Sequence, residues 1–535
     1  MEATKTGTYA RLTRRGLLLG MGGAALAPML NACTPAVTLP GPVARLYGRT
    51  GSFGGLATSS KLPTGESFAA AGVSGWQFGP GQSAYMSAVT ADGSVVMATT
   101  PYTDNQMQPT GSDMELGIFS PAASRFQRLQ VPSTRGYTKM LGPDGVTGGG
   151  DIGDVQVTTV NGAERVAFVS AVPFHGWRIN DWGQLPTVAM LAQSSAGTWS
   201  VDPGRNWTAD SLSTANTGSA ATFPAALDAF GETYHHARGL CEMALLPRSQ
   251  HLVITQYFGD ETTQQGGVIV LDSAGKLRAR FQYPAVTAGG VSVKVNVREV
   301  ETDPSSAVDD ERFVVVCDTF APSGTTVPFA VQEFSYRASA GTITPVSNAV
   351  LASGDGARAE TTKFGADGTL YVARTQPDGM TAAPLAVYRK TNGERRLVRS
   401  APASAGWAGR WNTVVAPDQF VSGTGTTGLV RSLSVDPTTG AVLIAGASGH
   451  LQVVRAAIPG APLLMTRDVD LGLNSLVDRW TRWIGFRKGS VDAARRLLWL
   501  PVPQLANLST CPSGCPTTAL DQWLYRIDLA QLLGK

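Results

Sequence analysis

Charged residues are scarce in this sequence of 535 residues: Asp, Glu, Lys and Arg together make up 16% of it. Disordered chains are rich in charge, and long coiled coils need charged positions around their apolar seam, so the composition excludes both classes. The 61 Gly and 32 Pro indicate instead a globular chain with many turns.

Histidine is scarcer still, with five copies, and the common catalytic signatures are missing. No Gly-x-Ser-x-Gly, P-loop or His-Glu-x-x-His pattern occurs. His235 and His236 are adjacent, and neighbouring residues of an extended chain point in opposite directions, so the two are poorly placed to share a metal. The sequence therefore predicts neither a metal nor a cofactor. It leaves open whether the protein is an enzyme, and favours the view that it is not.

Apolar runs long enough to cross a membrane are also missing, but the N-terminus has the order of an export signal. Thr13-Arg14-Arg15-Gly16-Leu17 resembles the twin-arginine motif, and a Gly/Ala-rich run follows it to Pro28. Leu30-Asn31-Ala32-Cys33 resembles a bacterial lipobox, which implies cleavage before Cys33 and its lipidation. An ordinary secretory signal with an incidental Cys33 is the alternative. We expect residues 1–32 to be a signal peptide and residues 33–42 a linker.

Net charge gives no sign of a nucleic-acid partner. The whole chain carries a formal charge of +3, and residues 1–32 account for all of it, with four basic residues and one acidic one. The remaining chain is neutral. A neutral surface lacks the basic patch on which binding to nucleic acid depends.

Cysteine is the last scarce residue, and its distribution suggests a disulfide. Apart from Cys33, the chain has four cysteines, an even number that suits an exported protein. Cys511 and Cys515 are predicted to close a small disulfide loop. Cys241 and Cys317 either pair with each other or are buried free thiols.

Short alternating segments joined by tight turns are what the chain has in abundance. In Gly356–Arg374 two such segments flank Ala366-Asp367-Gly368, and period-2 alternation around an Asp-Gly turn predicts a β-hairpin. Similar hairpins recur along the chain, at Ser87–Ala98, Val157–Val169, Met243–Thr255, Val300–Val316, Leu433–Ile444 and Gly485–Leu500. Most are followed by a second hairpin, so the repeating unit has four antiparallel strands.

Repeated four-stranded units predict an all-β fold, a single β-propeller of about seven blades spanning residues 43–535. The repeat resembles the quinoprotein-like, YVTN and NHL propellers, whose units read DxxGxLYVA. An array of β-sandwiches is the alternative. The seventh unit lacks an outer strand, and Val43–Gly48 at the N-terminus is expected to supply it and so to close the ring.

Long connections between the predicted strands gather on one face of such a ring, where function usually resides. An arginine comes just before the innermost strand of five units, so these side chains are expected to surround the channel mouth and to suit an anionic ligand. They are Arg238, Arg298, Arg358, Arg431 and Arg482. The alternative is that each pairs with a nearby acid, namely Glu242, Glu299, Glu301 or Glu360.

A second candidate element on this face is the connection Val172–Trp182. Its aromatic and polar side chains are suited to stacking on, and hydrogen bonding with, a sugar or planar ligand. They are His175, Trp177, Asp181 and Trp182, with His235 and His236 expected on the same face. Packing over the channel is the simpler explanation of the aromatic residues.

These observations favour an exported protein, lipid-anchored on the outer side of the cytoplasmic membrane or in the cell envelope. Its propeller would bind a small anionic or sugar ligand or other envelope proteins. The alternative is a secreted phosphoesterase-like hydrolase acting on an anionic substrate at the channel mouth. Arg358-Ala359-Glu360 resembles part of the PhoX-type alkaline phosphatase pattern, but the rest of that pattern is missing. A quinone-dependent dehydrogenase is a third hypothesis, and the tryptophan docking motif of that family is not repeated here.

Overall fold

The computed structural model shows an all-β chain. It describes residues 45–47, 73–78, 82–101, 115–122, 125–130, 140–141, 147–148, 151–171, 186–208, 226–227, 233–234, 240–260, 265–284, 286–288, 291–320, 331–351, 358–375, 382–399, 430–446, 450–456, 463–470, 488–503 and 522–534. The expected signal peptide, the linker and Cys33 lie outside these residues.

Seven antiparallel sheets form the blades of a propeller. Blade 1 consists of β3 (Gln82–Val89), β4 (Val95–Pro101), β5 (Glu115–Ser120) and β6 (Arg125–Gln130). Blade 2 consists of β9 (Asp151–Val160), β10 (Ala163–Ala171), β11 (Pro186–Gln193) and β12 (Trp199–Thr208). Blade 3 consists of β15 (Leu240–Leu245), β16 (Leu252–Asp260), β17 (Gln265–Leu271) and β18 (Leu277–Gln282).

The next three blades repeat this order. Blade 4 consists of β20 (Val291–Thr302), β21 (Glu311–Phe320), β22 (Val331–Arg337) and β23 (Thr342–Leu351), with β19 (Val286–Ala288) paired to the start of β20. Blade 5 consists of β24 (Arg358–Phe364), β25 (Leu370–Thr375), β26 (Ala382–Thr391) and β27 (Glu394–Arg399). Blade 6 consists of β28 (Val430–Val435), β29 (Val442–Gly446), β30 (His450–Ala456) and β31 (Leu463–Asp470).

Blade 7 combines the two ends of the propeller. It consists of β32 (Ser490–Asp492), β33 (Leu497–Pro503), β34 (Gln522–Asp528), β2 (Val73–Phe78) and β1 (Arg45–Tyr47). The prediction that an N-terminal strand closes the last blade is confirmed. The expected segment is corrected, however: β2 pairs with β34, and β1, within the predicted Val43–Gly48, pairs one place further out. Val73-Ser74-Gly75-Trp76 contains a glycine and shows little alternation of apolar and polar residues, so the sequence pattern does not predict this strand.

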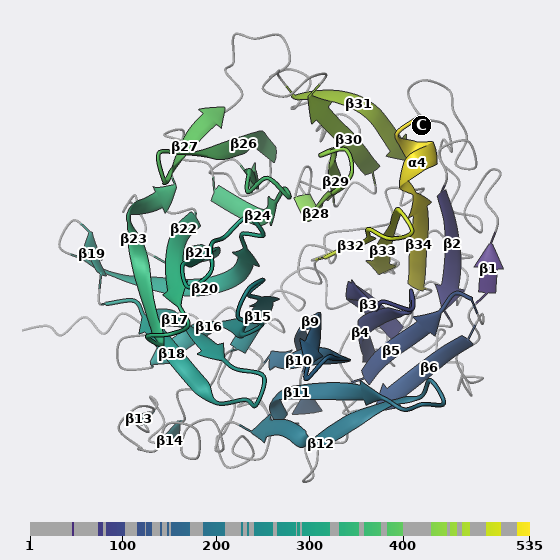
Figure 1. Cartoon of the computed structure of the whole chain (residues 1–535), viewed down its shortest axis with the longest axis horizontal. Coiled ribbons are helices and arrows are strands. Elements are labelled where there is room, and N and C mark those ends of the chain that lie inside the picture. The colour runs from purple at the N-terminus through teal and green to yellow at the C-terminus, as the bar shows by residue number, and fades with distance from the viewer. Residues whose placement is uncertain are drawn as a thin grey trace, which may run out of the picture. The chain divides into compact units, whose positions relative to one another are not determined.

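The first strand of every blade is the innermost one. The first strands of successive blades contact one another in order, and β3 of blade 1 contacts β32 of blade 7, so the ring is closed. Figure 1 shows these seven strands around the centre and the later strands of each blade further out. Seven blades of four strands are what the hairpin repeat predicts, and blades 4 and 7 each carry one additional strand, β19 and β1.

Face-to-face stacking of the blades explains why their central strands are continuously apolar. All of β17 is buried. Val268 and Val270 on one face pack with residues of blade 4, whereas Ile269 and Leu271 on the other pack with residues of blade 2. A strand buried on both faces has no position left for a polar side chain facing solvent.

Turn residues set where the strands reverse. Asn392 and Gly393 both have positive φ, of 53° and 82°, as a two-residue type I′ hairpin turn between β26 and β27 requires. Gly368, in the Asp-Gly turn between β24 and β25, has a φ of 75°. The hairpin predicted around Ala366-Asp367-Gly368 is therefore confirmed.

Few other elements occur among the described residues. Two short hairpins pair β7 (Met140–Leu141) with β8 (Thr147–Gly148), and β13 (Ala226–Leu227) with β14 (Thr233–Tyr234). The described part of the chain has one helix, α4 (Leu529–Leu532), which is capped by the Asp528 carboxylate. No helix within these ranges is long and apolar enough to span a membrane.

Cys317, on β21, is a buried cysteine that is not part of a disulfide. Its Sγ donates to Tyr283 Oη over 3.4 Å. A disulfide between Cys241 and Cys317 is therefore not formed. The predicted pair Cys511 and Cys515 lies outside the described residues.

Candidate functional site

A β-bulge interrupts the innermost strand in each of blades 1 to 6. In blade 4, for example, Val297 pairs with Cys317 and Glu299 with Val316, which leaves Arg298 as the extra residue. The same shift occurs between Ala84 and Met86, Ile152 and Asp154, Leu240 and Met243, Ala359 and Thr361, and Val430 and Ser432. A bulge re-aims the side chains next to it and disrupts the ladder of backbone hydrogen bonds.

Equivalent residues at the end of these bulges or directly after them form what we call the axial ring. Its polar members are Asp154, Glu242, Glu299, Thr361, Ser432 and Lys488. Lys488 just precedes β32 of blade 7. A contact that recurs between successive blades indicates its place in the ring.

In this contact, the backbone N–H that follows a ring residue donates to the ring residue of the preceding blade. Met243 N donates to Asp154 Oδ2 over 3.0 Å, and Thr362 N donates to Glu299 Oε1 over 2.7 Å. Gly489 N donates to Ser432 Oγ over 2.9 Å. Lys488 has no acceptor in its side chain, and Ser87 N donates to its backbone carbonyl instead, over 3.1 Å. The ring side chains thus satisfy N–H groups and join the blades.

Lys488 reaches across the centre of the ring. Its Nζ lies 3.0 Å from Asp154 Oδ2 of blade 2 and 3.1 Å from Glu242 Oε2 of blade 3. Both carboxylates are almost fully buried. Burial alone would lower the pKa of Lys488, but the charges of Asp154 and Glu242 raise it well above its usual value. Lys488 is therefore a cation held between two acids, which links blade 7 to blades 2 and 3.

Glu299 is the ring carboxyl whose ionisation is least favoured. Burial, and next the negative charge of Glu242, raise the pKa of Glu299 to about 7. Its Oε1 accepts from Thr361 Oγ1 over 2.8 Å as well as from Thr362 N. With 3% of its surface exposed, Glu299 can exchange a proton near neutral pH but offers little surface to a substrate.

Two further contacts connect blades 4 and 5 beside the ring. Glu301 lies two residues after Glu299 on β20, and its carboxylate pairs with Lys363 Nζ of β24. Arg298 donates from Nη1 to the Glu360 carbonyl over 2.7 Å and from Nη2 to the Ala359 carbonyl over 3.0 Å. The Arg298 guanidinium thereby supports the bulge of the neighbouring blade.

Three of the five predicted arginines are on innermost strands. Arg298 is in β20, Arg358 begins β24, and Arg431 is the extra residue of the bulge in β28. Arg298 Nη1 is also 4.0 Å from Glu299 Oε2. The other predicted residues lie outside the described part of the chain: Arg238, Arg482, His175, Trp177, Asp181, Trp182, His235 and His236.

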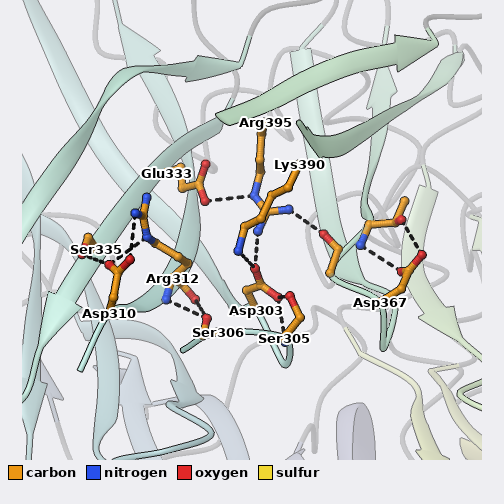
Figure 2. A network of polar contacts seen from close by, with 12 residues as sticks. Asp303, Ser305, Ser306, Asp310, Arg312, Glu333, Ser335, Asp367, Lys390 and Arg395 are labelled. Atoms are coloured by element: carbon orange, nitrogen blue, oxygen red, sulfur yellow. Dashed lines mark hydrogen bonds and ion pairs between the residues drawn. The ribbon is translucent and has the colours of Figure 1, made fainter. Parts of the chain in front are cut away.

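A second polar network lies near the short turns of blades 4 and 5, and Figure 2 shows it. Arg395 of β27 is fully buried and pairs with Asp303 and, over 3.0 Å, with Glu333 of blade 4. Lys390 Nζ also contacts Asp303 Oδ2, over 2.6 Å. Burial opposes ionisation of Asp303, but hydrogen bonds from Lys390 and Ser305 outweigh it and lower its pKa. The network joins two blades at a distance from the axial ring.

No group of three or more His, Cys, Asp and Glu side chains within the described ranges could hold a metal ion. The acids of the axial ring are engaged by the Lys488 ammonium group, by threonine hydroxyl groups and by backbone N–H groups.

The sequence patterns do not indicate most of the axial ring. The sequence offers Glu242, Glu299 and Glu301 as partners of arginines. Glu242 and Glu301 pair with Lys488 and Lys363 instead, whereas Glu299 Oε2 does lie 4.0 Å from Arg298 Nη1. The available signal was positional. Thr361 stands five residues before the turn residue Ala366, and Glu242, Glu299, Ser432 and Lys488 stand at the same distance before the turns of their blades, whereas Asp154 precedes its Asn161-Gly162 turn by seven residues.

No family model and no curated protein matches this chain. Solved propeller structures do resemble it. The Dos1 propeller is 11% identical, with 84% of this chain and 93% of that chain covered and a TM-score of 0.42. A periplasmic gluconolactonase of Pseudomonas aeruginosa, PpgL, is 14% identical, with 72% and 85% covered and a TM-score of 0.41. Sqt1 of Saccharomyces cerevisiae is 8% identical, with 84% and 98% covered and a TM-score of 0.40. At such values the likeness concerns the propeller fold and gives no information on activity.

Proposed function

We propose that this protein is an exported lipoprotein of the bacterial cell envelope whose propeller acts as a ligand-binding or protein-interaction module. The observation that supports a scaffold most strongly is the pairing of Lys488 with Asp154 and Glu242 across the ring. These charges are buried and engaged in joining blades, as a rigid support for binding loops requires. The order of Arg14-Arg15, an apolar run and Cys33 supports the cellular address.

Membrane fractionation of the native host tests the address. Cys33→Ala should move the folded protein from the membrane to the soluble exported fraction, because the acyl chains are its anchor. Lys-Lys in place of Arg14-Arg15 should leave it in the cytoplasm. Retention of the Cys33→Ala protein in the membrane would contradict the lipid anchor, and normal export of the Lys-Lys protein would contradict twin-arginine export.

The binding role is tested at the innermost strands. Thermal unfolding of the protein would be followed with sulfate, citrate and monosaccharides, since any ligand that prefers the folded state raises Tm. The double variant Arg358→Gln/Arg431→Gln should lose the rise caused by the anions. Lys276→Gln/Arg337→Gln removes the same charge from outer hairpins and should retain it. Equal responses of the two variants would rule out an anion site at these arginines.

A hydrolase acting on an anionic substrate is the second candidate, and one observation favours it. Glu299, with its pKa raised to about 7, has the proton affinity that acid–base catalysis at neutral pH requires. Turnover of a phosphoester panel with and without Ca²⁺, lost in Glu299→Gln, would support this function. No turnover by the folded wild-type protein would exclude phosphoester hydrolysis and leave the binding role.

A further inference from the structure

The outer hairpin of blade 5 carries four cations at two consecutive cross-strand positions. Arg389 of β26 is directly opposite Arg396 of β27, and Lys390 is directly opposite Arg395. Residues opposite each other on paired strands share a face of the sheet, and consecutive positions alternate between faces. The two cation pairs therefore lie on opposite faces of one hairpin.

On the face towards blade 4, the cations have acidic partners. Tyr388, which shares this face, packs with Val314 and Val331 of blade 4. Lys390 contacts Asp303, and Arg395 contacts both Asp303 and Glu333. Here the fold supplies two carboxylates for two cations. On this face, the positive charges of Lys390 and Arg395 are therefore balanced by the negative charges of Asp303 and Glu333.

The face with Arg389 and Arg396 lacks such compensation within the described residues. Among the described residues, Arg396 Nη2 contacts Glu394 Oε2 over 3.3 Å, and that contact is largely exposed, with 67% and 47% of the two side chains accessible. Arg389 Nε is buried without a hydrogen-bond partner in this part of the chain. The nearby Asp367 is occupied by Thr369, whose N and Oγ1 donate to it over 3.0 Å and 2.8 Å.

Like charges directly opposite on paired strands destabilise a sheet, and the exposed Glu394 offers one negative charge to the two arginines, so a bound anion would stabilise the pair. Guanidinium groups bind the oxygens of phosphate in a fork-like geometry, and a phosphate monoester carries close to two negative charges at neutral pH. We propose that Arg389 and Arg396 form a binding site for a phosphate group on the outer hairpin of blade 5. The phosphate belongs either to a small soluble anion or to a phospholipid head group.

This site is separate from the binding role proposed above, because it is on outer strands and does not involve the innermost arginines. The experiment uses the purified protein in a buffer without phosphate. Binding of inorganic phosphate is measured by calorimetry against chloride at equal ionic strength. Sedimentation with phosphatidylglycerol vesicles, compared with phosphatidylcholine vesicles, is measured in parallel. The first variant is Arg389→Gln/Arg396→Gln.

The matched control is Lys276→Gln/Arg337→Gln, which removes two charges from the corresponding hairpins of blades 3 and 4. We expect the Arg389/Arg396 variant to bind phosphate, or the anionic vesicles, at least about tenfold more weakly than wild type, because two charge-assisted contacts are lost. The control should bind as wild type does. Binding of inorganic phosphate identifies a soluble ligand, whereas binding of anionic vesicles alone identifies a head group.

Either positive result supports the site, provided that it depends on Arg389 and Arg396. Absence of both kinds of binding in the wild-type protein would overturn the proposal, as would equal losses in the two double variants. Arg358→Gln/Arg431→Gln should leave this binding intact, so failure here and failure of the proposed site at the innermost strands can be told apart. Melting curves of each variant confirm that it is folded.

Discussion

Glu299 illustrates how the axial ring shifts the pKa of a single residue. Burial and the neighbouring Glu242 raise its pKa to about 7, above the usual value of 4.5. The folded state therefore holds the Glu299 proton at pH values at which the unfolded state has released it. When the folded state binds more protons, stability falls as pH rises. Ionisation of Glu299 should weaken the fold between pH 4.5 and about 7.

Glu299→Gln tests this directly, because glutamine keeps an oxygen acceptor for Thr361 and Thr362 and cannot ionise. Urea unfolding of both proteins would be measured between about pH 5 and 8. The difference in unfolding free energy should move in favour of the variant as pH rises, by up to about 1.4 kcal/mol per pH unit. Parallel curves for the two proteins across this range would show that Glu299 ionises normally.

At the level of elements, the first hairpin of each blade could be predicted from its sequence. The bulge in its inner strand and its contacts with other blades could not. Alternation around a turn such as Ala366-Asp367-Gly368 is a local property of the chain, so it predicts the two strands of a hairpin. The recurrence of such hairpins predicts the number of blades. The bulge at Arg298 depends on the register with β21, and the partner of Glu242 comes from the other end of the chain. Neither property is recorded in a local pattern.

The turn between β24 and β25 shows how an element is fitted to its neighbour. A Cβ on Gly368 would collide with Ser305 Oγ and stand 3.0 Å from Asp303 Oδ1 of blade 4. Gly368 also has a φ of 75°, which non-glycine residues adopt at a cost. Gly368→Ala should therefore lower the unfolding free energy by more than backbone strain alone.

Gly393→Ala is the matched control, because Gly393 has a φ of 82° but no atom within 4 Å of its added Cβ. Backbone strain in the control should amount to about 1 kcal/mol, and Gly368→Ala should lose a further ~1–3 kcal/mol through the clash with blade 4. Chemical denaturation of both variants measures the difference. Equal losses would mean that blade 4 moves aside without cost.

For the whole molecule, closure relies on contacts between residues far apart in the sequence. β2 completes blade 7 through its register with β34, such as Trp76 opposite Leu524. At the centre, Lys488 connects blade 7 to blades 2 and 3 and so bypasses blade 1. Removing one partner of a buried ion pair lowers the free energy of unfolding by roughly 3–5 kcal/mol, because the remaining charge stays buried without a partner.

Hydrogen–deuterium exchange of the wild-type protein and Lys488→Met therefore tests most directly whether the axial charges join the blades. If they do, the variant should lose protection together in β9 and β15, whose Asp154 and Glu242 are left without their cation. The outer hairpin β26–β27 of blade 5 contributes no residue to this contact and should exchange as in the wild type. Loss of protection confined to the residues around Lys488 would contradict the account.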